Sequence, residues 1–200
     1  MSDITKNPIN RREALKRTAL LLGGVVSAPT ALGFLNGCSA NANAEGFQLL
    51  NEGQAKLVTS VSDIIIPTTD TPGAAEVGVP TYIDDMVMNM WGEEDREQFL
   101  ANLKGFEQRA KREIGTSFND ATLEQQTTFV NAEHDRVFRG NVDWDAPRPF
   151  IWQMKELTIS GYFSTEVGMT QVLQYIQVPG RFDACLPFEE AGGRVWAYNM

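Results

Sequence analysis

The chain has 200 residues and a formal net charge of −9, from 17 basic and 26 acidic residues. Five basic and two acidic residues fall within the first 37 positions, a net charge of +3, so the rest of the chain carries −12. This acidic balance argues against binding to nucleic acid, whose phosphates need a basic surface, and against binding to anionic lipid through charge.

Residues 1–37 have the pattern of an export signal. Arg11 and Arg12 stand in the sequence NRREALK, which resembles the twin-arginine motif, and a mildly apolar run follows over residues 18–35. Glycine, proline and hydroxyl residues interrupt that run, whereas a transmembrane helix needs about 20 predominantly apolar residues. A positive cluster ahead of a short apolar run is typical of a removed signal. We therefore expect residues 1–37 to be a twin-arginine signal that lies outside the fold.

The signal ends in LNGCSA, which resembles a bacterial lipobox with Cys38 as the residue that receives lipid. The polar residues that follow suit a tether, which we place at residues 38–47. These features predict a periplasmic lipoprotein held on the membrane by an acyl chain. Cleavage after Ala42 or Ala44 is the alternative, and it would give a soluble product.

The chain has two cysteines, Cys38 and Cys185. If Cys38 carries lipid, Cys185 is unpaired and is expected to be a buried apolar residue. If Cys38 is not acylated, a disulfide between the two is an alternative in an oxidising compartment.

Residues 48–200 are predicted to form one all-α domain, because apolar residues recur at helical spacing through most of this region. The expected helices cover about residues 51–66, 81–91, 93–114, 122–138, 150–161 and 165–173. The fold class is therefore a single-domain helical bundle of about five to six helices. Its C-terminal segment, rich in aromatic residues, glycine and proline, is expected to be irregular.

Local signals mark several helix ends. Asn51 with Gln54, and Thr122 with Gln125, have the spacing of capping boxes, in which each residue of the pair satisfies a backbone N–H of the other. Gly115 stands where a left-handed C-terminal residue would end the third helix.

Candidate catalytic groups are few. His134 is the single histidine, and its sequence NAEHDRVF is interpreted as a solvated helix face. Asp84 and Asp85 point about 100° apart on a helix and are interpreted as surface charge. Nucleotide-binding and nucleophile-elbow motifs are not found. The sequence thus predicts a chain with no catalytic, cofactor-binding or metal-binding residues of its own.

The C-terminal region holds Tyr162, Phe163, Tyr175, Phe182 and Phe188 among glycines and prolines. Such segments either plug the core or dock a partner, since aromatic anchors dominate interface energies. Composition alone leaves both interpretations open.

Two stretches resemble the gluconate 2-dehydrogenase subunit 3 family: SVSDIIIPTTDTPGAAEVGVPTYIDDMV at residues 60–87 and TISGYFSTEVGMTQVLQYIQVPGRFDAC at residues 158–185. The resemblance implies a non-catalytic small subunit that escorts an FAD-dependent large subunit of the glucose-methanol-choline type through twin-arginine export. That large subunit would oxidise a sugar or sugar acid, and a cytochrome c or another carrier would take the electrons.

The resemblance also moves the C-terminal region towards partner docking. The partner-interface residues predicted on this basis are Tyr162, Phe163, Glu166, Tyr175, Pro179, Gly180 and Phe182. Cys38 departs from the family pattern and suggests that the small subunit is anchored directly.

The alternative function is a stand-alone exported lipoprotein that binds a sugar or another small ligand. Its stacking faces would come from Trp144, Trp152, Trp196 and Tyr198.

Overall fold

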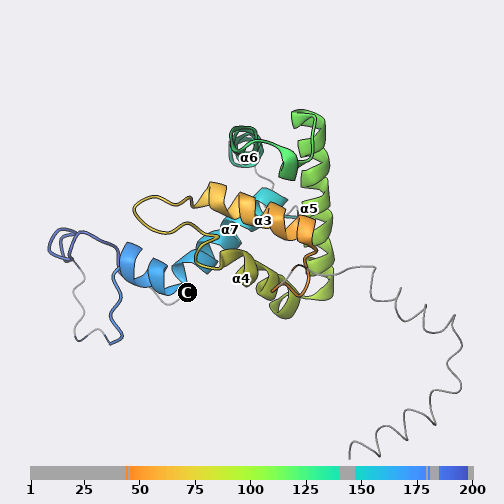
Figure 1. Ribbon diagram of the computed structural model, residues 1–200. Coiled ribbons are helices and arrows are strands. Elements are labelled where there is room, and N and C mark those ends of the chain that lie inside the picture. The colour runs from red at the N-terminus through yellow and green to blue at the C-terminus, as the bar shows by residue number, and fades with distance from the viewer. Residues whose placement is uncertain (1–43, 45, 140–146, 179, 181–184, 198–200) are drawn as a thin grey trace, which may run out of the picture. The chain divides into compact units, whose positions relative to one another are not determined.

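Helix α7 (Phe150–Phe163) is central to the fold and contacts α3 (Glu52–Ile65), α4 (Val79–Asp85), α5 (Glu93–Ile114) and α6 (Leu123–Phe138) (Figure 1). The structure, a computed structural model, describes residues 44, 46–139, 147–178, 180 and 185–197. These residues belong to one compact unit that spans residues 43–200. The all-α prediction is confirmed, since the described residues contain helices and no β-strand.

The helix ends follow the local signals in the sequence. Asn51 and Gln54 form a complete capping box at the start of α3, and Thr122 and Gln125 form another at the start of α6. Gly115 ends α5 with φ of 87°, a left-handed conformation that glycine adopts without steric cost. These ends were predictable because each depends on residues within one helical turn.

The second helix differs from its predicted form. It begins at Val79, because Pro80 is favourable in a first turn, where its missing N–H costs nothing. It then continues into the π-helical turn η1 (Met86–Met90). Two further short elements are the 3₁₀ turn η2 (Phe118–Asp120) and the π-helical turn η3 (Gly168–Val172).

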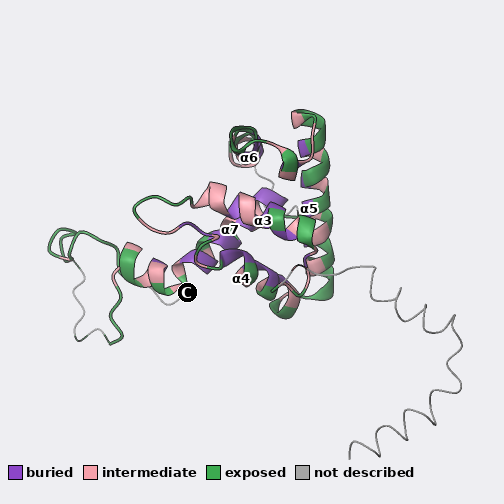
Figure 2. Cartoon of the chain, viewed as in Figure 1, coloured by how far each residue is buried: buried purple, intermediate pink, exposed green. Residues whose placement is uncertain are grey.

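The core is rich in phenylalanine rings that pack against one another in T-shaped and tilted pairs. Phe106 of α5 lies 4.9–5.4 Å, centroid to centroid, from the rings of Phe118, Phe129 and Phe150, and so joins η2, α6 and α7. Burial of each such ring contributes about 1.5–3 kcal/mol. Figure 2 shows this buried layer in purple, mainly along α7 and the helix faces turned towards it.

Packing against the core extends to the N-terminal side of α3. Ala44 and Phe47, which fall within the predicted tether, are partly buried against the core. Gly46 is exposed, while residues 38–43 and 45 of the predicted tether, together with the export signal, Arg11, Arg12 and Cys38, lie outside the described residues.

Burial ends soon after α7. None of the described residues from Met169 to Ala197 is buried, and Figure 2 colours this stretch mostly green. Its one ladder-like contact is an isolated parallel bridge between Gln174 and Trp196. The segment is thus irregular, as predicted, but it does not plug the core.

Candidate partner-binding surface

The two sequence stretches of the family resemblance pack against each other. The Tyr162 hydroxyl donates to the carbonyl of Pro72 at 2.8 Å, and the Tyr82 and Ser160 hydroxyls lie 3.2 Å apart. Gly161 faces the ring of Tyr82 so closely that a Cβ there would lie 2.6 Å from Cδ1. Residues some 80–90 positions apart therefore form one structural unit of α4, α7 and the loop before α4.

Tyr162 is placed as a core residue. It is only 2 % exposed, and its hydroxyl is satisfied within the chain. Phe163 is half-buried and meets the Tyr162 ring edge to face at 5.5 Å. A role in partner binding remains a prediction for both, but their first role is to hold α7 against the loop before α4.

The other predicted interface residues lie beyond α7. Glu166, Tyr175 and Gly180 are exposed, whereas Pro179 and Phe182 lie outside the described residues. Exposed residues can contact a partner directly, whereas buried ones cannot. The predicted role in partner binding is therefore more consistent with the exposed residues after η3 than with those on α7.

Sequence reasoning missed most of the exposed apolar surface. Seven of the ten large hydrophobic residues that are exposed in the described chain fall between positions 175 and 196. They are Tyr175, Ile176, Val178, Leu186, Phe188, Val195 and Trp196. These apolar residues are spaced irregularly among glycines and prolines, so their pattern does not predict which of them are buried. Only the tertiary structure shows that they are exposed.

Cys185 also lies in this segment and is exposed. The expectation of a buried apolar residue is wrong, because the segment contributes no side chain to the core. Its pairing with Cys38 stays a prediction.

The interpretation of Asp84 as surface charge is wrong. Asp84 is 1 % exposed, and its carboxylate accepts hydrogen bonds from the backbone N–H groups of Gln48, Leu49 and Leu50 at 2.6–3.2 Å. Asp85 is exposed, as expected, and accepts from the side chain of Gln48 at 2.7 Å. The buried carboxylate fastens the chain segment that precedes α3 onto α4.

His134 is not simply solvated either. Its ring stacks on Phe138 at 4.7 Å, and its Nε2 lies 3.2 Å from Nζ of Lys155 on α7. Lys155 in turn lies over the Phe138 ring at 4.6 Å. These contacts join α6 to α7 and bring no serine or cysteine nucleophile to the imidazole.

A second polar cluster joins α5 to α6. Glu133, 3 % exposed, accepts from the Arg109 guanidinium at 2.9–3.2 Å and also pairs with Arg136. Arg136 reaches Glu113 at 3.2 Å. The cluster neutralises a buried carboxylate and is a packing feature.

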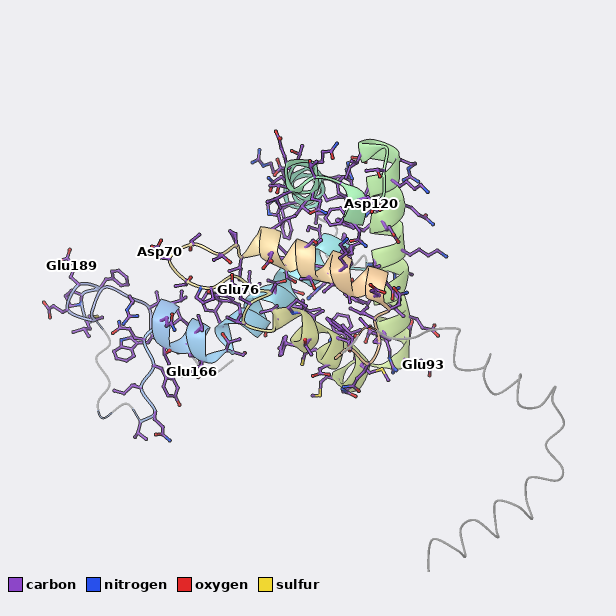
Figure 3. The ribbon with its side chains drawn as sticks, viewed as in Figure 1. Asp70, Glu76, Glu93, Asp120, Glu166 and Glu189 are labelled. Carbon is purple, nitrogen blue, oxygen red and sulfur yellow. The ribbon has the colours of Figure 1, made fainter. Side chains whose placement is uncertain are left out.

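The acidic surface is dispersed. Figure 3 labels six exposed carboxylates that are spread along the chain, including Asp70 in the loop after α3, Glu93 at the start of α5 and Glu189 in the C-terminal segment. Within the described part of the chain, histidine, cysteine and carboxylate residues do not gather in a group that could hold a metal ion. Nor is any helix described here long and apolar enough to cross a membrane.

Of the residues proposed for sugar stacking, the structure describes Trp152 and Trp196, and neither lines the groove found in the described chain. An open groove of about 530 Å³ lies between α3 and α5, and no aromatic residue lines it. Trp152 packs on Phe138 at 5.1 Å with Arg148 over its ring, while Trp196 lies in the C-terminal segment. Trp144 and Tyr198 lie outside the described residues.

The sequence model of the family named gluconate 2-dehydrogenase subunit 3 matches residues 52–180, more than half of the chain. The chain belongs to this family. The match begins with α3 and ends just after η3, so it includes α3 to α7 and the first part of the exposed apolar segment. No curated protein and no solved structure matches this chain significantly. As a member of a subunit family, the chain has a dehydrogenase complex as its partner, and the resemblance stated from the sequence is confirmed.

Proposed function

We propose that this gluconate 2-dehydrogenase subunit 3 protein is the non-catalytic small subunit of an FAD-dependent dehydrogenase that oxidises a sugar or sugar acid. The family match over residues 52–180 carries the proposal. In this proposal the large subunit, of the glucose-methanol-choline type, holds FAD and performs the oxidation. A cytochrome c or another carrier accepts the electrons.

The small subunit has three tasks in the proposal. Its twin-arginine signal, with Arg11 and Arg12, takes the folded pair through the membrane. Its helical domain stabilises the large subunit, and an acyl chain on Cys38 holds the complex on the periplasmic face. The pattern NRREALK and the lipobox-like LNGCSA support the first and third tasks.

Co-expression tests the escort role. The large flavoprotein is produced with the wild-type chain, without it, and with a chain in which Arg11 and Arg12 are both replaced by lysine. FAD absorbance and dye-linked dehydrogenase activity are then measured in cytoplasmic, periplasmic and membrane fractions. We expect exported, active flavoprotein only when the large subunit is produced together with the wild-type chain, and not in the other two cultures. Equal export and activity without this chain would contradict the proposal.

Anchoring is tested separately. Cys38→Ser is expected to move the complex from the membrane fraction to the soluble periplasm without loss of activity. Cys185→Ser is the matched control, and it should leave the distribution unchanged. If Cys38→Ser leaves the complex in the membrane fraction, an acyl chain on Cys38 is not what holds it there.

A further inference from the structure

The last described part of the chain forms a loop that closes on itself, here called the C-terminal loop and defined as residues 174–178 and 185–197. In Figure 1 it is the blue segment after η3. Its two ends meet at the isolated bridge, where the Gln174 N–H donates to the Val195 carbonyl at 2.9 Å and the Ala197 N–H donates to the Gln174 carbonyl at 2.6 Å. The loop is therefore a defined element and not a loose tail.

Two long polar side chains hold this closure. The Gln174 side-chain amide donates to the carbonyls of Ala191 and Arg194 at 2.7 and 2.5 Å. The Arg194 guanidinium donates to the Gln171 carbonyl at 2.8 Å, at the C-terminal end of η3, where carbonyls lack helical partners. Gly192, with φ of 97°, leaves room for the Gln174 amide, because a Cβ there would lie 2.7 Å from Oε1. The two ends of the loop are thus joined by side chains as well as by backbone.

The apolar side chains of the loop are left in solvent. The seven named above are between 37 and 76 % exposed, although they include a tryptophan, a tyrosine and a phenylalanine. A large aromatic side chain covers about 150–250 Å² when buried, so the exposed fractions of Tyr175, Phe188 and Trp196 leave roughly 300 Å² of aromatic surface, and the four aliphatic side chains add to it. A soluble monomer rarely exposes an apolar patch larger than a few hundred Å², and each partner in an interface of standard size contributes about 800 Å². The loop is therefore large enough to form the centre of a stable interface.

The charges on the loop disfavour a second copy of this chain as the occupant. Glu189 and Glu190 are exposed beside Phe188, so the described residues of two paired loops would bring four carboxylates together with two guanidiniums, those of Arg194, into one interface. The chain outside its signal is also strongly acidic, so two copies repel each other. Membership in a subunit family instead supplies a protein partner of a different kind.

We infer that the C-terminal loop is a preformed docking element for the large, FAD-containing subunit, and that Gln174 and Arg194 are positioning residues that hold it ready. This inference rests on the proposed function. The hydrogen bonds of Gln174 and Arg194, here called the lock, reduce the entropy lost on binding, because they order the loop before the partner binds. Phe188 and Trp196 are the aromatic anchors, whereas Gln174 and Arg194 belong to the loop but not to its apolar surface.

Binding of the purified chain to the purified large subunit tests the anchors. Replacing Phe188 and Trp196 together by serine is expected to raise the Kd at least about 30-fold, the effect of losing one interface hot spot. Leu123→Ser is the matched control, because Leu123 is 71 % exposed at the start of α6, outside the loop. It should change the Kd less than about 3-fold. If the double variant binds as tightly as the wild-type chain, the inference is wrong.

The lock is tested with Gln174→Glu, a change of nearly equal size that removes both side-chain donors. We expect the Kd to rise about 10-fold and the backbone amides of residues 185–197 to exchange hydrogen faster in the free chain. The unfolding midpoint should stay within about 2 °C of the wild-type value, because the loop contributes nothing to the core. A lowered midpoint with an unchanged Kd would show a merely structural role and overturn the assignment.

Two other outcomes separate this inference from the proposed function. If the wild-type chain binds no flavoprotein at all, the proposed function fails first. If sedimentation shows dimers of the free chain that the Phe188/Trp196 double variant abolishes, the loop pairs copies of this chain, and the inference is wrong while the escort role still stands.

Discussion

Replacing Asp84 by asparagine removes one of the two carboxylate oxygens that hold the segment before α3. The wild-type carboxylate accepts from three consecutive backbone N–H groups and is 1 % exposed. Asparagine keeps one oxygen and turns an NH₂ group towards backbone donors, so at least one of the three N–H groups loses its acceptor. A hydrogen bond to a charged group contributes about 1.5–3 kcal/mol. We therefore expect a loss of roughly 2–4 kcal/mol in the free energy of unfolding.

The measurement is urea unfolding of the purified protein, followed by far-ultraviolet circular dichroism. For a chain of this length, a loss of about 3 kcal/mol also lowers the thermal midpoint by roughly 6–12 °C. Asp85→Asn is the matched control, because Asp85 is exposed and contacts only the Gln48 side chain in the described structure. It should change stability by less than about 0.5 kcal/mol. Equal, small effects of both variants would refute the reasoning.

Three further variants, the first with a matched control, test the packing around α7 and α6. Gly161→Ala places a Cβ 2.6 Å from the Tyr82 ring, so we expect a loss of about 1–3 kcal/mol in the free energy of unfolding, although alanine is the better helix former. Gly105→Ala is the control, because its Cβ would meet only a flexible arginine side chain at 3.6 Å. It should be neutral or stabilise the protein by up to about 1 kcal/mol. Tyr162→Phe keeps the ring and loses the hydroxyl bond to the loop before α4, so we expect a loss of about 1 kcal/mol in urea unfolding, with partner affinity unchanged. Glu133→Gln removes the buried carboxylate that two partly exposed arginines contact, and we expect a loss of about 1–3 kcal/mol, measured in the same way.

Each of these variants has an outcome that contradicts its reasoning. Equal stabilities of the Gly161 and Gly105 variants would mean that α4 shifts away from α7 at no cost. A large loss of partner affinity in Tyr162→Phe, with stability unchanged, would place that hydroxyl in the interface. A Glu133→Gln protein as stable as the wild-type protein would mean that solvent replaces the carboxylate.

Much of the exposed apolar surface of the C-terminal loop was not predictable. The sequence points to aromatic residues after α7, and Tyr175 and Phe188 among them are indeed exposed. Tyr162 has the same local character, yet it is buried, because the carbonyl that satisfies its hydroxyl comes from a loop 90 residues earlier. The closure of the loop by Gln174 and Arg194 joins residues 20 positions apart that have no periodic relation.

The sequence by itself determined the helical architecture and the family. Capping boxes, the terminal Gly115 and the helical spacing of apolar residues act within a turn or two, so the chain specifies them locally. The tertiary structure alone decided which polar and aromatic residues are buried. Asp84 and Asp85 are adjacent and chemically identical, but one is buried against three backbone donors 34–36 residues away and the other is in solvent. Burial depends on what packs against a residue from elsewhere in the chain, and one helical step of about 100° is enough to separate an inside position from an outside one.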